Sequence, residues 1–238
     1  MPPGGPHPHT RSGQRSLPKQ DADRMISGRA EPEKVMLDTP RIDSESLGDP
    51  LRHRKLEELE ERLEALPRAP RERGRVELIV ARSEGGRRES PDRVRLEADA
   101  GVPGDAWGRQ RGPHAERAIT VMRFDVAELI ANGQPLLLFG DNLFLSLDLS
   151  TDNLPPGSRV RAGGAVLEVT PMAHNGCRKF RGRFGVDALR LVSKAELRHR
   201  NLRGIYMRTL QGGEIARADP VEVIARGPLP AADVNTPS

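Results

Sequence analysis

The sequence predicts a mainly β domain, a closed or nearly closed barrel with a few short helices, behind a disordered N-terminal extension. From residue 75 onward, short stretches of β-forming residues alternate with Gly, Pro, Asn and Asp turns, as they do in β-barrels. All Trp, Tyr and Phe residues lie between residues 107 and 206. Residues 1–48 are rich in Pro, Gly, Ser and Asp and lack apolar periodicity, a composition typical of disorder.

Residues 49–74 are expected to form an amphipathic helix and a linker. Asp49 is expected to be the N-cap, with Pro50 at the first helical position. Leucines then recur at helical spacing until Pro67 ends the run. They are Leu56, Leu59, Leu63 and Leu66. This stripe spans barely two heptads, which favours docking on the barrel over a dimerising coiled coil.

The barrel domain is expected over residues 75–226, followed by a flexible tail, 227–238. The candidate strands are Val76–Arg82, Val94–Ala98, Ala118–Arg123, Leu143–Leu149, Arg159–Arg161, Ala165–Thr170, Ile205–Leu210, Glu214–Arg217 and Val221–Ala225. Gly163-Gly164 and Gly212-Gly213 each separate two candidates and are expected to be hairpin turns. Short helices are expected at Phe124–Ala131 and near Gly185–Arg190.

The composition limits the class of protein. The 238 residues allow one domain plus an extension, and the net charge is +4 with an isoelectric point near 9.7. The single cysteine excludes an intramolecular disulfide and fits a reducing compartment. Because the first residues lack the apolar core of a secretory signal and no apolar run could span a membrane, we expect a cytoplasmic protein.

Met172–Phe184 is the segment that carries the most chemistry. Asn175-Gly176 predicts a turn that places Cys177, the single cysteine, on a loop. Basic or imidazole side chains surround it in sequence: His174, Arg178, Lys179, Arg181 and Arg183. Nearby cations favour the thiolate, which is the nucleophile, the sulfur carrier and the ligand of soft metals. The alternative is that Cys177 is a small buried apolar residue.

Other site types lack their motifs. No second Cys or His pair completes a zinc site with His174 and Cys177. No Gly-x-Ser-x-Gly elbow supports hydrolysis, and no glycine-rich phosphate or dinucleotide motif follows a strand.

Seven landmarks, in order, resemble the MOSC family, named after the C-terminal domain of molybdenum-cofactor sulfurases. The resemblance extends from about residue 75 to 225. The landmarks are Gly101–Trp107, Gly140–Leu143, Leu147–Leu149, Leu154–Val160, Ala165–Thr170, His174–Phe180 and Arg203–Tyr206.

The resemblance implies a β-barrel of the kind seen in pyruvate kinase, with a pocket near Cys177. It also implies binding of the molybdenum cofactor (molybdopterin) or transport of sulfur through that cysteine, and the family is associated with pyridoxal phosphate as well. Standalone members look like reductases of N-hydroxylated compounds. Two positions depart from the family pattern: Gly176 stands where one branch has proline, and Asp141 stands where glutamate is common.

The resemblance also suggests roles for single residues. Cys177 would be the metal ligand and catalytic thiolate, and His174 would orient or protonate a substrate. Basic side chains would hold the cofactor phosphate. These are Arg178, Lys179, Arg181 and Arg183. Asn142 would contact the pterin, with Asp141 beside it. The alternatives are a simple turn at Asp141-Asn142 and a surface histidine without a role.

The sequence leaves three functions open. A reductase would need an external electron-donor protein, because the chain has no cysteine pair for an iron–sulfur cluster and no flavin or NAD motif. A sulfur carrier would hold a persulfide on Cys177 and need a sulfur-donor protein. A non-catalytic barrel could instead offer a basic face to an acidic partner or nucleic acid. Its residues would be Arg181, Arg183, Arg190, Arg198, Arg200 and Arg203. Scarce aromatic residues argue against base stacking.

Overall fold

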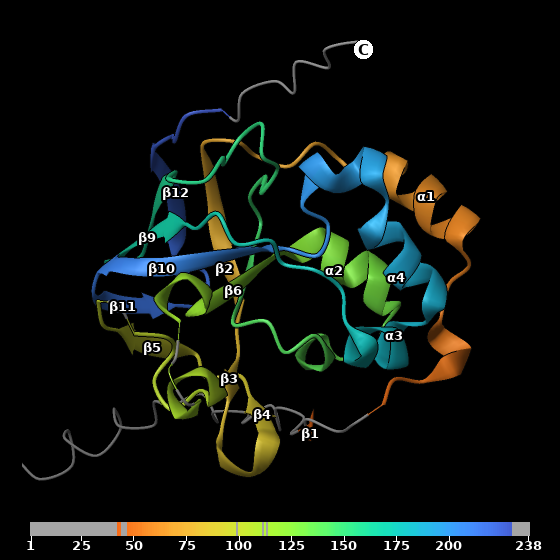
Figure 1. Cartoon of the computed structure of the whole chain (residues 1–238), viewed down its shortest axis with the longest axis horizontal. Coiled ribbons are helices and arrows are strands. Elements are labelled where there is room, and N and C mark those ends of the chain that lie inside the picture. The colour runs from red at the N-terminus through yellow and green to blue at the C-terminus, as the bar shows by residue number, and fades with distance from the viewer. Residues whose placement is uncertain (1–41, 44–46, 99, 111, 113, 230–238) are drawn as a thin grey trace, which may run out of the picture. The chain divides into compact units, whose positions relative to one another are not determined.

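The structure is a computed structural model that describes residues 42–43, 47–98, 100–110, 112 and 114–229 (Figure 1). The expected extension, 1–48, lies outside the described residues except for 42–43 and 47–48. The expected tail, 227–238, lies outside them except for 227–229.

Seven strands close into a barrel in the order β10-β6-β7-β2-β12-β8-β9, which confirms the predicted fold class (Figure 1). Their bounds are β2 (Arg73–Ile79), β6 (Ile119–Arg123), β7 (Leu143–Leu145), β8 (Arg159–Ala162), β9 (Ala165–Val169), β10 (Ile205–Gln211) and β12 (Pro220–Ala225). Neighbouring strands are antiparallel except β6 and β7, which are parallel. Along β10, Ile205, Met207 and Thr209 are buried while the residues between them are partly exposed, the alternation of a strand with one face in the core.

Two small sheets flank the barrel. One has the order β1 (Ile42–Asp43), β4 (Arg87–Glu89) and β3 (Ala81–Arg82), and the other pairs β5 (Arg93–Leu96) with β11 (Gly213–Ala216). Gly163-Gly164 joins the paired strands β8 and β9, as predicted. The second predicted hairpin is wrong, because β11 pairs with β5 and not with β10. Gly213 serves close packing instead: a Cβ there would lie 2.1 Å from the Gly164 carbonyl oxygen.

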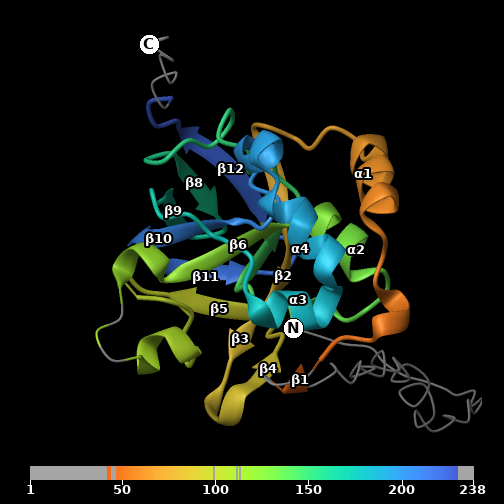
Figure 2. The same ribbon diagram turned by 45° about the vertical axis from the view of Figure 1, so that its right-hand side comes forward.

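Four α-helices lie together beside the barrel (Figures 1 and 2). They are α1 (Leu56–Ala65), α2 (Phe124–Ala131), α3 (Arg178–Phe184) and α4 (Val186–Ser193). Leu59 and Leu63 of α1 are almost fully buried among them, in a second core that also holds Phe139 and Phe180. Asp49 caps a separate 3₁₀ helix, so α1 begins later than the sequence indicates.

Six 3₁₀ helices complete the described elements. They are η1 (Pro50–Arg52), η2 (Glu84–Gly86), η3 (Ala106–Arg109), η4 (Ala115–Arg117), η5 (Leu136–Leu138) and η6 (Ala195–Arg200). No helix in the described part of the chain combines the length and apolar character needed to cross a membrane.

Candidate functional site

Buried polar side chains gather where the segment before β7 meets β3, η3 and the start of β10. Gly140 has a φ of 75°, in the left-handed region that glycine adopts without strain. This turn leads into Asp141 and Asn142, which are 1% and 0% exposed. Burying a polar group costs free energy unless the group is hydrogen-bonded. The hydrogen-bond partners of Asp141 and Asn142 therefore indicate their roles.

Asn142 uses its whole amide inside the protein. Its Oδ1 accepts from the backbone N of Thr120 at 3.1 Å and from the Thr120 hydroxyl at 3.0 Å. Its Nδ2 donates to the Val80 carbonyl and to Asp105 Oδ1, both at 3.2 Å. An amide makes about four hydrogen bonds. Asn142 therefore holds the barrel end together and keeps no donor or acceptor for the pterin contact expected from the sequence.

Asp105 is the acceptor for a second part of this network. Arg82, on β3, donates from Nε at 2.9 Å and from Nη2 at 2.5 Å, one nitrogen to each carboxylate oxygen. Asp105 also caps η3 by accepting from the backbone N of Trp107. Burial opposes ionisation of Asp105, but the hydrogen bonds and the charge of Arg82 outweigh it and lower the pKa of this carboxyl.

Asp141, His174 and Arg203 form a third group, here called the Asp141 cluster. Arg203 Nη1 donates to Asp141 Oδ2 at 2.7 Å, and both side chains are almost fully buried. His174 Nε2 lies 3.7 Å from Asp141 Oδ1. The His174 ring also packs 4.5 Å from the ring of Tyr206, which belongs to β10. Segments far apart in sequence thus meet at one carboxylate.

His174 is neutral at physiological pH. Its side chain is 7% exposed, and burial lowers its pKa from 6.5 to about 3. The charge of Arg203 contributes to this lowering of the pKa, while Asp141 acts in the opposite direction. A neutral imidazole carries one donor and one acceptor nitrogen. The His174 side chain is therefore buried in a polar cluster. The alternative, a histidine on the surface without a role, does not describe this position.

Three atoms of the Asp141 cluster have no hydrogen-bond partner within the described chain. They are Asp141 Oδ1, His174 Nδ1 and Arg203 Nε. Leaving a buried polar atom unsatisfied costs about 1–3 kcal/mol, so such atoms mark places where water or a ligand completes the bonding. The grouping of three such atoms around one carboxylate makes this the candidate site.

Cys177 ends the segment that carries His174. Its thiol is free and exposed, and the residue precedes the first turn of α3, where its carbonyl accepts from the backbone N of Arg181 at 3.0 Å. Gly176 lies close to α4: a Cβ there would lie 2.3 Å from Leu189 Cδ1, so a larger residue would require this leucine side chain to move.

The basic residues after Cys177 lie on a helix, which corrects the predicted loop. Arg178, Lys179 and Arg181 are exposed on α3. Arg183 is buried, and its Nη1 donates to the Leu138 carbonyl at 2.9 Å. The structure therefore separates Arg183 from the exposed group and assigns it to packing α3 against η5.

Arg203 links the Asp141 cluster to α3. Its guanidinium carbon lies 5.2 Å from the ring centroid of Phe180, a cation–π contact that places α3 beside the cluster. Arg82, Asp105 and Tyr206 had no site role in the sequence-based assignment, and Arg203 was assigned only to a basic face. Asp105, Arg203 and Tyr206 lie within the landmarks Gly101–Trp107 and Arg203–Tyr206, but the landmarks do not show which residues are in contact.

Tyr206 faces the cluster from β10 and stays protonated. Burial raises the pKa of its hydroxyl, while the charges of Arg117 and Arg203 act in the opposite direction. Within the described ranges, no group of three or more His, Cys, Asp or Glu side chains could hold a metal ion.

Comparison with solved structures finds similar chains of low sequence identity. The YuaD protein from Bacillus subtilis is 16% identical with a TM-score of 0.49, covering 65% of this chain and 97% of its own. YiiM from Escherichia coli is 20% identical with a TM-score of 0.44, covering 64% and 71%. YiiM from Geobacillus stearothermophilus is 20% identical with a TM-score of 0.40, covering 68% and 77%. A search of curated proteins found no match.

The model of the MOSC domain matches residues 116–222. This range includes the candidate-site residues Asp141, His174, Cys177 and Arg203. It includes five of the barrel strands in full and the first half of β12, and it leaves out β2. Residues 116–222 of this chain are thus similar to the MOSC domain.

Proposed function

We propose that this chain binds the molybdenum cofactor beside the Asp141 cluster, with the Cys177 thiolate as the protein ligand of molybdenum. One observation carries the proposal. An exposed, unpaired thiol ends the same short segment that brings His174 into a buried cluster with three unsatisfied polar atoms. The MOSC family is associated with this cofactor, and the donors present fit it.

The fit rests on the chemistry of the donors. A thiolate is a soft ligand, suited to a metal that is otherwise held by the sulfur atoms of the cofactor. The phosphate of the cofactor needs cationic donors, and the exposed Arg178, Lys179 and Arg181 follow Cys177 on α3. The unsatisfied atoms of the Asp141 cluster would bind polar groups of the pterin or of a substrate.

His174 and Tyr206 would position a substrate and not carry charge. With a pKa near 3, His174 stays neutral and can offer only one donor and one acceptor. Tyr206 remains a protonated phenol that can donate a hydrogen bond. Asp141 Oδ1 lies 3.7 Å from the imidazole, and Arg203 holds Asp141 in place.

The reaction that fits is reduction of an N-hydroxylated compound. The bound cofactor would supply a two-electron redox centre at which the N–O bond breaks. Two electrons and two protons convert R–NHOH into R–NH₂ and water. The chain has a single cysteine, too few to ligate an iron–sulfur cluster, so the electrons would come from a separate donor protein.

The exposed thiol also supports a second candidate, a sulfur carrier. A persulfide on Cys177 would need access for a donor and an acceptor protein, and the thiol is exposed. Incubation with a cysteine desulfurase and free cysteine, followed by intact-mass measurement, would detect the added sulfur atom. A carrier should gain it on wild-type protein and not on Cys177→Ser.

Elemental analysis tests the cofactor proposal. Wild-type protein purified from a host that makes molybdopterin should retain molybdenum, and Cys177→Ser should lose it. Arg178→Ala combined with Arg181→Ala should lower the retained amount. The charge-matched control is Arg95→Ala with Arg161→Ala. Both residues are exposed, on β5 and β8, and neither belongs to α3. Absence of molybdenum from the wild type, or equal amounts in Cys177→Ser, would contradict the proposal.

A further inference from the structure

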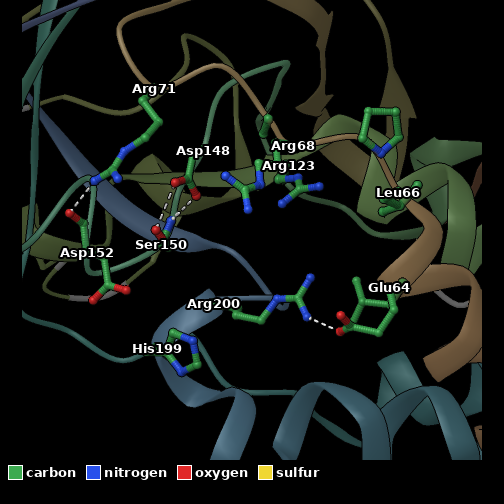
Figure 3. Close-up of a pocket in the computed structure, with 13 residues that line it drawn as sticks. Glu64, Leu66, Arg68, Arg71, Arg123, Asp148, Ser150, Asp152, His199 and Arg200 are labelled. Atoms are coloured by element: carbon green, nitrogen blue, oxygen red, sulfur yellow. Dashed lines mark hydrogen bonds and ion pairs between the residues drawn. The ribbon is translucent and has the colours of Figure 1, made fainter.

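A cavity of about 640 Å³ lies between the linker after α1, the segment after β7 and η6 (Figure 3). It shares no residue with the Asp141 cluster or with α3. Four arginines line it: Arg68 and Arg71 from the linker, Arg123 from the end of β6 and Arg200 from η6. Its volume is in the range of small-molecule sites.

Arg123 is fixed in place by a carboxylate outside the cavity. Its Nε and Nη2 donate to the two oxygens of Asp125 at 2.6 and 2.7 Å, and the side chain is 12% exposed. Asp125 is itself held by the backbone N of Val126 at 2.8 Å. The Nη1 group takes no part in this pair, so Arg123 is a preorganised donor at the cavity wall.

Arg200 and Arg68 face the cavity from two other segments (Figure 3). Arg200 donates from Nη1 to Glu64 Oε1 at 2.6 Å, which leaves its other nitrogens available. Arg68 is exposed and makes no hydrogen bond or ion pair with any other described residue. Three guanidinium groups thus surround one space, and one of them lacks a counter-charge.

The acids of the cavity do not neutralise Arg68. Asp148 accepts from the backbone N and the hydroxyl of Ser150, both at 3.0 Å, and no Lys or Arg nitrogen of the described chain lies within ion-pair distance of it. Asp152 is exposed. Arg71 Nη2 donates to its backbone carbonyl at 2.7 Å and not to its carboxylate. Both carboxylates remain able to accept hydrogen bonds from a ligand.

We propose that this cavity binds a sugar phosphate. The phosphate would take charge-assisted hydrogen bonds from Arg68, Arg123 and Arg200, whose planar groups match phosphate oxygens. The hydroxyl groups of the sugar would donate to Asp148 and Asp152. None of the residues lining the cavity is Phe, Tyr or Trp, so the cavity has no aromatic side chain on which a nucleotide base could stack. This site is independent of the proposed cofactor site.

Calorimetric titration of the full chain with ribose 5-phosphate tests the assignment. Wild-type protein should bind it more tightly than ribose or inorganic phosphate. Arg68→Ala should weaken binding by at least about tenfold, because one charge-assisted contact is lost. Arg161→Ala, which removes the same charge from exposed β8, should bind like wild type.

Three results would overturn the proposal. They are no binding of ribose 5-phosphate by wild-type protein, equal weakening in Arg68→Ala and Arg161→Ala, and binding of ribose or inorganic phosphate as tight as that of ribose 5-phosphate. Substitution of the exposed Arg68 removes no hydrogen bond or ion pair between described residues, so a loss of binding would not reflect misfolding.

Discussion

The neutral, buried His174 should make the fold sensitive to acid. In the folded protein its pKa is about 3, against an ordinary value of 6.5 that applies once the chain unfolds. Between these pH values the unfolded chain binds a proton that the folded chain does not. The free energy of unfolding therefore falls as the pH falls through this window.

The size of the effect follows from the pKa difference. Each pH unit below 6.5 costs about 1.4 kcal/mol until the pH nears 3. At a pH two units below 6.5, we expect His174 to remove roughly 2–3 kcal/mol of stability. This is a large share of the 5–15 kcal/mol typical of a folded domain.

Urea unfolding followed by circular dichroism, repeated across this pH range, measures the loss. Carboxylates also titrate there, so the informative quantity is the difference between wild type and His174→Gln, which cannot take up the proton. His199→Gln, at an exposed position, is the matched control and should follow wild type. If wild type and His174→Gln lose stability equally with falling pH, the reasoning is refuted.

Three further outcomes follow from the contacts. Arg203→Met should lower the free energy of unfolding by about 3–5 kcal/mol in a urea titration, because it leaves a buried carboxylate uncompensated; a loss under about 1 kcal/mol would contradict the buried pair. Asn142→Ala should cost at least about 3 kcal/mol in the same assay, since four hydrogen bonds are lost in the core, and a near-neutral result would mean that the network is not formed. Cys177→Ser should change stability by no more than about 0.5 kcal/mol, and iodoacetamide should label the native thiol; a thiol that reacts only in denaturant would show that Cys177 is buried.

The barrel could be predicted because its strands carry local signals. Aliphatic runs bounded by turn residues located every barrel strand within a few residues of its observed bounds. β4 was missed because its sequence, Arg87-Arg88-Glu89, is wholly charged, and pairing with β1 and β3 stabilises it. The strand propensity of a segment depends on the strands with which it pairs, so the sequence of three residues does not predict it.

α3 shows how tertiary packing overrides local sequence. The Asn175-Gly176 turn placed Cys177 and the basic residues after it on a loop, but Arg178–Phe184 is helical. Phe180 and Phe184 are spaced by four positions and both are buried, in contact with Phe139. That hydrophobic contact stabilises the helix, as it does for many short helices.

The Asp141 cluster could not be derived from local patterns. Its carboxylate and its arginine are 62 positions apart, and they meet because the turn at Gly140 and the start of β10 lie at the same end of the barrel. The sequence therefore identified Cys177, His174 and Asp141 as residues of interest but did not show which residues contact them. Arg203 in particular was read as part of a basic surface, whereas it is buried in an ion pair.

X-ray absorption at the molybdenum edge is the most direct test of the central claim that Cys177 ligates the cofactor. Wild-type protein loaded in a molybdopterin-producing host should show one more sulfur ligand on molybdenum than the dithiolene of the cofactor provides. Cys177→Ser protein, reconstituted with the same cofactor, should lack that sulfur. An identical sulfur count in the two proteins would contradict the account.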